Sequence, residues 1–370
     1  MEALILSCGT GGGHNAAGRA IEEELLRLGH KAVMLNPYNL AGEKLPRRGD
    51  GAYIKLATDA PGAFGLMYSL GEAVRRLPGS SPVYWANGLM AQRMQEYLEA
   101  HNYDVVIMPH LFPAEILTFL KRRAKRVPKT VFIATDYSCI PFTEETDCDR
   151  YVIPSDLLKN DFIRRGIPEE KLLPLGIPVS RDFSRALSQA EAKAFLSLEP
   201  ELKYILLSGG SMGAGGMAQT VKRLSEELKK QPGWGLIVIC GSNNRLYGQL
   251  SELYSSSSRI KLVKRTPYMA WYLKACDVFI TKPGGLSSTE AAVSGVPIIH
   301  VSPIPGCESI NMRFFTEHNM SLDGGKEPEQ LLKALDQALQ KETAENIISS
   351  QSNIINKNAA SQICAALNEL

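Results

Sequence analysis

The feature that most constrains this chain is a unit that occurs twice, in which an apolar run ends in glycines and a helical pattern follows. The first copy has its apolar run at residues 3–8 and its glycines at 9–13, and the second begins at residue 204 with "YILLSGGSMG". A strand that feeds a helix through a tight turn is the repeating unit of parallel sheets covered by helices. The sequence therefore predicts two similar α/β halves.

Further apolar runs continue this pattern in both halves. They lie at residues 31–36, 103–110, 129–136 and 150–155 in the first half, and at residues 235–241, 259–264, 277–282 and 297–302 in the second. Most are separated by segments with helical spacing. The stretch 173–187 contains prolines and shows no clear period, so we interpret it as a linker. Residues 41–90 form a connection of a length that is often functional.

Length and composition exclude several classes of protein. A chain of 370 residues can form two domains, and its net charge of +2 argues against a protein that mainly holds nucleic acid. The seven cysteines form no CxxC pair, and an odd number suits no closed disulfide framework, so a reducing cytoplasm is the expected setting. The chain has no basic leader with an apolar segment and no run long enough to span a bilayer. Attachment to a membrane surface stays open.

The first glycine turn is suited to a ligand that comes close to the backbone. Four glycines among positions 9–13 stand where a strand feeds a helix, and the free N–H groups of the first helical turn attract anions. A tight turn without a ligand is the alternative. No lysine follows as in a phosphate-binding P-loop, and His14 replaces the third glycine of a dinucleotide fingerprint. Neither ATP hydrolysis nor NAD binding is supported.

The second half contains a stronger candidate for a phosphate site in "TKPGGLSSTEAAVSG" (281–295). Gly284 and Gly285 open a helix whose first turn carries hydroxyl side chains, a combination suited to a diphosphate. Glu290, one turn further, is placed to accept hydroxyls of a ribose, although a carboxylate near a helix start is also favoured by the dipole alone. The turn "LSGGSMG" (207–213), with Ser211, is a further glycine turn of the same half.

These motifs resemble a known group of enzymes. "GTGGGHNAAGRAI" is similar to the N-terminal signature of monogalactosyldiacylglycerol synthases and processive diacylglycerol glucosyltransferases, and "TKPGGLSSTEA" with "PGCESIN" resembles the nucleotide-sugar half of glycosyltransferase family 28. The resemblance implies a GT-B fold, with two Rossmann-like domains whose parallel sheets face a central cleft. We expect an acceptor domain at residues 1–178, a donor domain at 179–355 and a terminal helix at 356–370 that crosses back to the first domain.

The resemblance also assigns residues to the sugar donor. Glu290 would hold the uridine ribose, Glu308 and Asn311 would bond hydroxyls of the transferred sugar, and the backbone at Arg265 would contact the uracil. The glutamine that commonly precedes the glutamate is Cys307 here, which leaves the identity of the sugar open. Gly285, Ser287 and Ser288 would meet the diphosphate, with Ser211 beside it, and Gly13 and Gly284 are further positions expected to bind the donor.

The expected reaction is the inverting transfer of a hexose from UDP-glucose or UDP-galactose to a hydroxyl. His14 is the candidate general base, because a helix N-terminus disfavours the imidazolium and keeps the ring neutral. A turn-capping role or a contact to the donor sugar is the alternative for His14. Asp136, in "ATDYS", is the second candidate for the base or for a group that orients the acceptor.

No metal and no resident cofactor are expected, because a helix N-terminus can stabilise the leaving diphosphate electrostatically. The motif "DCD" (147–149) is the alternative, since some transferases hold a metal through an Asp-x-Asp pair. It follows an acidic segment and lies far in the sequence from the diphosphate motif, so a solvated acidic loop is the preferred interpretation.

The resemblance favours a diacylglycerol-type lipid as the acceptor, and hence an anionic membrane at the inner face of the plasma membrane. Trp85, Leu89 and Met90 would enter the headgroup boundary and Arg75 and Arg76 would meet anionic lipid, with His110 serving the acceptor. An ordinary helical subdomain is the alternative for this region. Two other functions stay open: an enzyme of the transferase or epimerase type with a soluble substrate, and a non-catalytic sensor of UDP-sugars.

Overall fold

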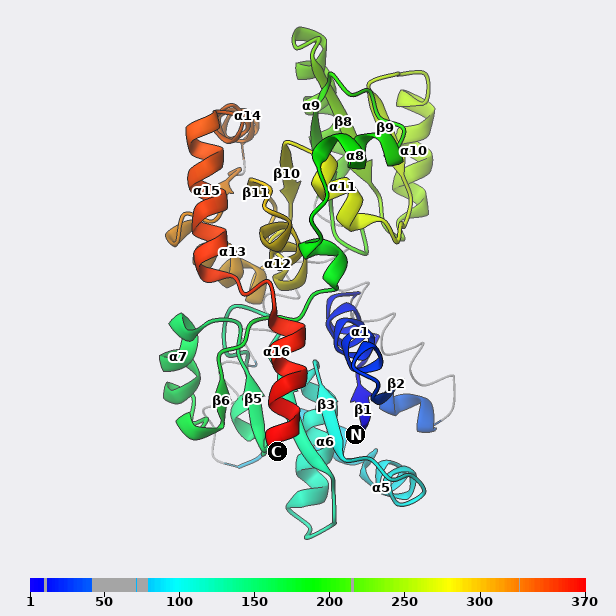
Figure 1. Ribbon diagram of the computed structural model, residues 1–370, viewed down its shortest axis with the longest axis vertical. Helices are drawn as coiled ribbons and strands as arrows, with labels where there is room; N and C mark the ends of the chain where they lie inside the picture. Colours follow the sequence, from blue (N-terminus) through cyan, green and yellow to red (C-terminus); the bar gives the residue numbers. More distant parts are fainter. Residues whose placement is uncertain (10–11, 42–70, 72–78, 214–215, 326) are drawn as a thin grey trace. The chain divides into compact units, whose positions relative to one another are not determined.

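The computed structural model describes residues 1–9, 12–41, 71, 79–213, 216–325 and 327–370 (Figure 1). The chain divides into two compact units. The first unit consists of Met1–Ser180, Pro305–Cys307 and Asn356–Leu370, and the second of Arg181–Ile304 and Glu308–Ile355.

The first unit is built on a six-stranded, wholly parallel sheet with the order β2-β1-β3-β4-β5-β6. Its strands are β1 (Glu2–Leu6), β2 (Lys31–Leu35), β3 (Val105–Met108), β4 (Lys129–Ile133), β5 (Arg150–Val152) and β6 (Leu172–Leu173). Its described helices are α1 (Gly12–Arg27), α4 (Pro82–Gly88), α5 (Ala91–Glu99), α6 (Leu111–Lys121), α7 (Lys159–Arg164) and α16 (Ala359–Ala366).

Helices cover both faces of this sheet because successive side chains of a strand point to opposite sides. Ile5 belongs to a buried cluster with residues of α1 and α16, whereas its neighbours Leu4 and Leu6 belong to a second cluster with residues of α5 and α6. All three strand residues are fully buried. Helix α16, from the end of the chain, packs against α1 (Figure 1).

The second unit contains another six-stranded parallel sheet, with the order β12-β11-β10-β7-β8-β9. Its strands are β7 (Lys203–Ser208), β8 (Trp234–Ile239), β9 (Ile260–Val263), β10 (Val278–Thr281), β11 (Ile298–His300) and β12 (Leu322–Asp323). Its described helices are α8 (Gln189–Phe195), α9 (Met217–Lys230), α10 (Asn244–Tyr254), α11 (Met269–Ala275), α12 (Gly285–Ser294), α13 (Cys307–Glu317), which continues from the first unit's Cys307, α14 (Pro328–Ala338) and α15 (Lys341–Ile354).

The core of the second unit follows the same rule. Ile205, Leu207 and their counterparts on β8 and β10 pack with the apolar faces of α9, α10 and α14. Helix α11 contacts β7, and helix α12 contacts β10. The strand residues Leu206 and Phe279, which alternate with those of this cluster, are fully buried as well. The predicted α/β architecture with two parallel sheets is therefore confirmed.

Two strands were not predicted, and both are short edge strands. β6 falls at the start of the stretch that we interpreted as a linker, and β12 follows α13. Each has only two residues, which is too short to show a strand period. The remainder of the predicted linker contains the 3-10 helix Arg181–Ser184, at the point where the second unit begins.

Two further expectations bear on the class of protein. All seven cysteines are free, and six of them are buried. Within the described ranges, no helix combines the length and the hydropathy that crossing a bilayer requires.

Candidate active site

Each sheet has one place where the direction of strand addition reverses. In the first unit this switch point lies between β1 and β3, and in the second it lies between β7 and β10. Ligands of open parallel sheets bind outside the carboxyl ends of the strands at such a point. The glycine turns singled out from the sequence follow β1, β7 and β10, so they lie at these two switch points.

His14 lies in the first turn of α1, beside the switch point of the first unit. Its Nδ1 is 2.8 Å from the carbonyl oxygen of Pro109 and 2.8 Å from Oγ1 of Thr135, which follow β3 and β4. A carbonyl oxygen can only accept a hydrogen bond, so we assign the ring proton to Nδ1. The lone pair of the neutral ring is then on Nε2, which can accept a proton.

The electrostatics of this site favour the neutral imidazole. Burial lowers the pKa of His14 below its ordinary value of 6.5, while the Asp136 carboxylate and the Pro109 carbonyl act in the opposite direction. Asp136 is thus close enough to His14 to act on its charge, and it is half-buried at the end of β4. The structure brings the two predicted catalytic residues together in one pocket.

This pocket belongs entirely to the first unit. His14, Thr135 and Asp136 line it together with Ser138, whose hydroxyl is buried without a hydrogen-bond partner. The other lining residues are Pro109, His110, Leu111, Phe132, Ala134, Ile140, Thr143 and Phe162. The pocket is therefore lined by both polar and apolar side chains. Thr135 and Ser138 were not predicted as site residues, although both belong to the segment "ATDYS" that was quoted for Asp136.

His110 lies against His14, with ring centroids 4.5 Å apart. It is the N-cap of α6, where Nδ1 accepts a hydrogen bond from the Phe112 N–H at 3.2 Å. Burial, and secondly the proximity of His14, place the pKa of His110 well below its ordinary value. A contact between His110 and the acceptor stays a prediction. The structure places His110 in the same pocket as His14, the predicted base.

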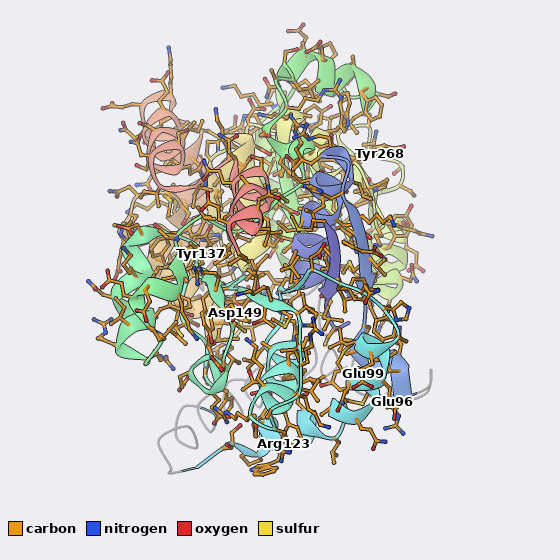
Figure 2. All side chains as sticks on the ribbon, turned by 60° about the horizontal axis from the view of Figure 1, so that its bottom comes forward. Glu96, Glu99, Arg123, Tyr137, Asp149 and Tyr268 are labelled. Atoms are coloured by element: carbon orange, nitrogen blue, oxygen red, sulfur yellow. The ribbon has the colours of Figure 1, made fainter. Side chains whose placement is uncertain are left out.

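The "DCD" motif lies at the other end of the same sheet. The N–H of Asp149 bonds the Thr130 carbonyl at the start of β4, whereas Tyr137 follows the end of that strand (Figure 2). Asp149 forms an ion pair with Lys121 at 3.0 Å, and Asp147 forms one with Lys171 at 2.9 Å. Among the described residues there is no group of three potential metal-ligating side chains. The two aspartates thus fasten α6 and the segment before β6 to the sheet.

The switch point of the second unit holds the N-terminus of α12. Gly284 is the N-cap, and no side chain caps this end of the helix. The first helical hydrogen bond is from the Ser288 N–H to the Gly284 carbonyl, at 3.0 Å. The N–H groups of residues 285–287 precede it, and such groups have no partner within a helix. Ser287 and Glu290, three residues apart on one helix face, are both partly exposed.

Two residues predicted to contact the donor instead support the turn from inside. Ser288 is fully buried, and its hydroxyl lies 2.9 Å from Nε2 of His300. The amide Nδ2 of Asn311, also fully buried, donates to the Pro283 carbonyl at 3.1 Å. Of the two hydroxyls, that of Ser287 is therefore the more accessible, and Asn311 holds the Pro-Gly-Gly turn; the predicted contacts of Ser288 and Asn311 to the donor stay predictions.

His300 has no counterpart in the predicted site. Its Nε2 faces Ser288, and its Nδ1 lies 3.0 Å from the hydroxyl of Ser321. Burial lowers its pKa to about 3, so the ring is neutral at physiological pH. It links the first turn of α12 to β11 and to the residue before β12.

Lys282 is a second residue that the sequence reasoning missed. It follows β10 directly, and its ammonium forms an ion pair with Glu308, the predicted sugar ligand, on α13. The other carboxylate oxygen of Glu308 accepts the Ile304 N–H at 2.9 Å. The sequence could have indicated Lys282, because this lysine belongs to the "TKPGG" motif and stands just before its glycines.

The remaining predicted donor residues are distributed as follows. Ser211, after β7, is exposed, and its carbonyl accepts the Ser242 N–H at 2.9 Å. Arg265 is exposed after β9. Gly13 lies in the first turn of α1 and thus belongs to the first unit, whereas the other donor residues belong to the second.

The residues predicted to meet a membrane are only partly described. Arg75 and Arg76 lie outside the described residues. Trp85, on α4, is 55% exposed. The guanidinium of Arg123, two residues after α6 (Figure 2), is 5.9 Å from the centre of the Trp85 ring and 3.4 Å from that of Phe119. Leu89 is 78% exposed, but the prediction for Met90 is wrong, because its side chain is buried in the core below α4 and α5.

Two family models match this chain, one in each half. Residues 14–179 match the family model of monogalactosyldiacylglycerol (MGDG) synthase, and residues 204–363 match that of the glycosyltransferase family 28 C-terminal domain. A processive diacylglycerol beta-glucosyltransferase of Bacillus subtilis (strain 168) is 26% identical over 321 residues, which cover 86% of this chain and 82% of the relative. The resemblance inferred from the motifs is confirmed.

Solved structures share the fold. The chain is similar to a UDP-GlcNAc 2-epimerase from Neisseria meningitidis, crystallised with UDP-GlcNAc, with a TM-score of 0.66, 14% identity and full coverage of both chains. It is also similar to MurG of Acinetobacter baumannii, with a TM-score of 0.64, 13% identity and coverage of 100% of this chain and 99% of that one. These likenesses confirm the predicted GT-B fold class of two Rossmann-like units.

Proposed function

We propose that this glycosyltransferase, whose two halves match the MGDG synthase and family 28 models, moves a hexose from a UDP-sugar to a hydroxyl of a diacylglycerol-type lipid. The relatives' names support the lipid acceptor and make UDP-glucose the first donor to test. UDP-galactose is the second, because the model that matches the first half is named for a galactolipid synthase.

The observation that carries the mechanism is the hydrogen bond between Nδ1 of His14 and the Pro109 carbonyl. It fixes the tautomer in which Nε2 is the base, and the lowered pKa keeps that nitrogen unprotonated near pH 7. In the proposed step, Nε2 takes the proton of the acceptor hydroxyl while its oxygen attacks the anomeric carbon. The bond from that carbon to the diphosphate breaks, and UDP leaves with the electron pair, so the configuration inverts.

The second unit receives the leaving group in this proposal. The uncapped start of α12 offers N–H groups and the positive end of the helix dipole to the diphosphate, and Ser287 adds a hydroxyl. Glu290, on the same helix face, is assigned to the ribose. No resident metal or cofactor is invoked, because these donors stabilise the developing charge themselves.

The acceptor lies in the bilayer, so we further propose peripheral attachment to an anionic membrane on the cytoplasmic side. The exposed Trp85 and Leu89, with Arg123 beside the aromatic ring, support this part of the proposal. Such a combination of rings and cations is typical of helices that lie at a lipid interface.

The test is a product assay on vesicles that contain diacylglycerol. We expect labelled hexose from UDP-glucose to appear in a lipid product on thin-layer chromatography, and UDP to be released only when diacylglycerol is present. Release of UDP without any lipid product would favour a soluble acceptor, and conversion of the UDP-sugar into an epimer would favour an epimerase. Binding of the UDP-sugar with no turnover under any condition would favour a sensor.

A further inference from the structure

Lys282 is a largely buried lysine at the switch point of the second unit. Its side chain is 11% exposed and that of Glu308, its ion-pair partner, is 9% exposed. Removing a lysine from water is unfavourable unless a partner compensates the charge, and here Glu308 is that partner. The pair joins the turn after β10 to α13.

The pair lies directly beside the uncapped start of α12. A side chain built at Gly284, the N-cap, would have Oε1 of Glu308 as its nearest neighbour, at 3.9 Å. Two positive groups, the lysine ammonium and the helix N-terminus, therefore lie close to one carboxylate. An anion at this helix end would come within reach of the lysine.

The glycine turn after β7 leaves room for the lysine side chain. A Cβ atom at Gly210 would lie 3.2 Å from Cε of Lys282, a distance tighter than most real contacts of a Cβ atom. Gly210 also has a φ of +72°, which disfavours other residues. The motifs after β7 and β10 thus meet at the aliphatic part of one lysine.

We propose that Lys282 contacts the diphosphate of the nucleotide and neutralises the negative charge that grows on it as the sugar leaves. The inference rests on the proposed function, because it takes the site at α12 to be the donor site. An ammonium has three donors, so Lys282 can keep its contact with Glu308 while it bonds phosphate oxygens. Lys282 would then supply, from the protein, the charge that a bound cation supplies elsewhere.

The test compares the affinities for UDP and for uridine by calorimetry, since only UDP carries the diphosphate. We expect Lys282→Met to weaken UDP binding by roughly 10- to 100-fold while uridine binding stays within about twofold. Lys282→Arg, which keeps the charge, should restore most of the loss. Lys274→Met is the matched control, because Lys274 bonds the Ser294 carbonyl at the other end of α12, at 2.7 Å; it should leave both affinities unchanged.

The outcomes separate this inference from the proposed function. If the wild-type protein binds UDP no better than uridine, the donor site itself is wrong. If the wild-type protein prefers UDP and Lys282→Met keeps that preference, the donor site stands and the role of Lys282 is overturned. Equal loss of both ligands in Lys282→Met, not restored by Lys282→Arg, would assign the lysine a structural role and also overturn the inference.

Discussion

The two switch points use the same architecture for different chemistry. Each combines a glycine turn, the end of a parallel strand and the start of a helix. In the first unit the helix start carries His14, held by a carbonyl and a hydroxyl and close to Asp136. In the second unit it carries no side-chain cap, and the ion pair of Lys282 and Glu308 lies nearby.

In the proposed mechanism, this difference divides the transfer reaction between the two units. A general base must change its protonation state during the reaction, so it requires a titratable group whose pKa lies near or below the working pH. A site that receives a leaving anion requires donors that are already in place before the bond breaks. His14 fits the first requirement, and the N–H groups at the start of α12 fit the second.

The largest expected effect tests the role of His14 at the first switch point. Replacing His14 with Ala removes the base, so kcat should fall by about 10²- to 10⁴-fold while the affinity for UDP stays within a few-fold. Steady-state kinetics at saturating acceptor, together with calorimetry of UDP, measure the two quantities separately.

A matched control for this change is His101→Ala. His101 belongs to the same unit but is exposed, and it bonds the Tyr97 carbonyl rather than any residue of the pocket. Its turnover should match the wild type. A His14→Ala enzyme with turnover within threefold of the wild type would refute the role of His14 as the base.

The variant Glu290→Gln tests the role of the second switch point in binding the donor. If this carboxylate holds the ribose, the change should weaken UDP and uridine by the same factor, roughly 10- to 100-fold, because both ligands carry the ribose. The same calorimetric titrations test it. A variant that loses affinity for UDP alone would place Glu290 at the diphosphate instead.

A pH-dependent effect of intermediate size comes from His300. Its pKa of about 3 in the folded protein lies below its unfolded value of 6.5, so the unfolded chain binds the proton first as the pH falls. The stability that it contributes is complete above pH 6.5 and decreases towards pH 3, with a loss of about 2 kcal/mol at pH 5. Urea unfolding of wild type and His300→Asn at pH 7 and pH 5 should show this difference, and an equal loss in both proteins would refute it.

The smallest expected effect concerns metal ions. With charge stabilisation supplied by α12 and Lys282, excess EDTA should change the rate by less than about twofold, and so should Asp147→Asn, whose carboxylate pairs with Lys171. Initial rates with EDTA and with added Mn²⁺ measure this. Strict dependence on Mn²⁺ would show that a cation, not the protein, receives the diphosphate.

Much of the fold could be predicted from the sequence because its strands are continuous apolar runs next to glycines. β6 and β12, with two residues each, carry no such pattern. At the site, a motif names residue types, as at His14 and Glu290, whose functional roles stay predictions. The orientation of Ser288 toward His300 depends on packing between β11 and α12, which no local pattern encodes.

Lys282 also shows that contacts between residues far apart in the sequence are not predicted by a local motif. Its motif was recognised, but its importance depends on Glu308, which lies 26 positions later and meets it only through the fold. Met90 illustrates a third case, since its neighbours Trp85 and Leu89 are exposed while helix packing buries Met90.

A crystal structure with UDP tests most directly whether the second switch point receives the leaving group. We predict that the β-phosphate oxygens accept hydrogen bonds from the backbone N–H groups of residues 285–287, with the ammonium of Lys282 in contact. A diphosphate bound in the pocket of His14, or held by a metal ion on Asp147 and Asp149, would contradict the account.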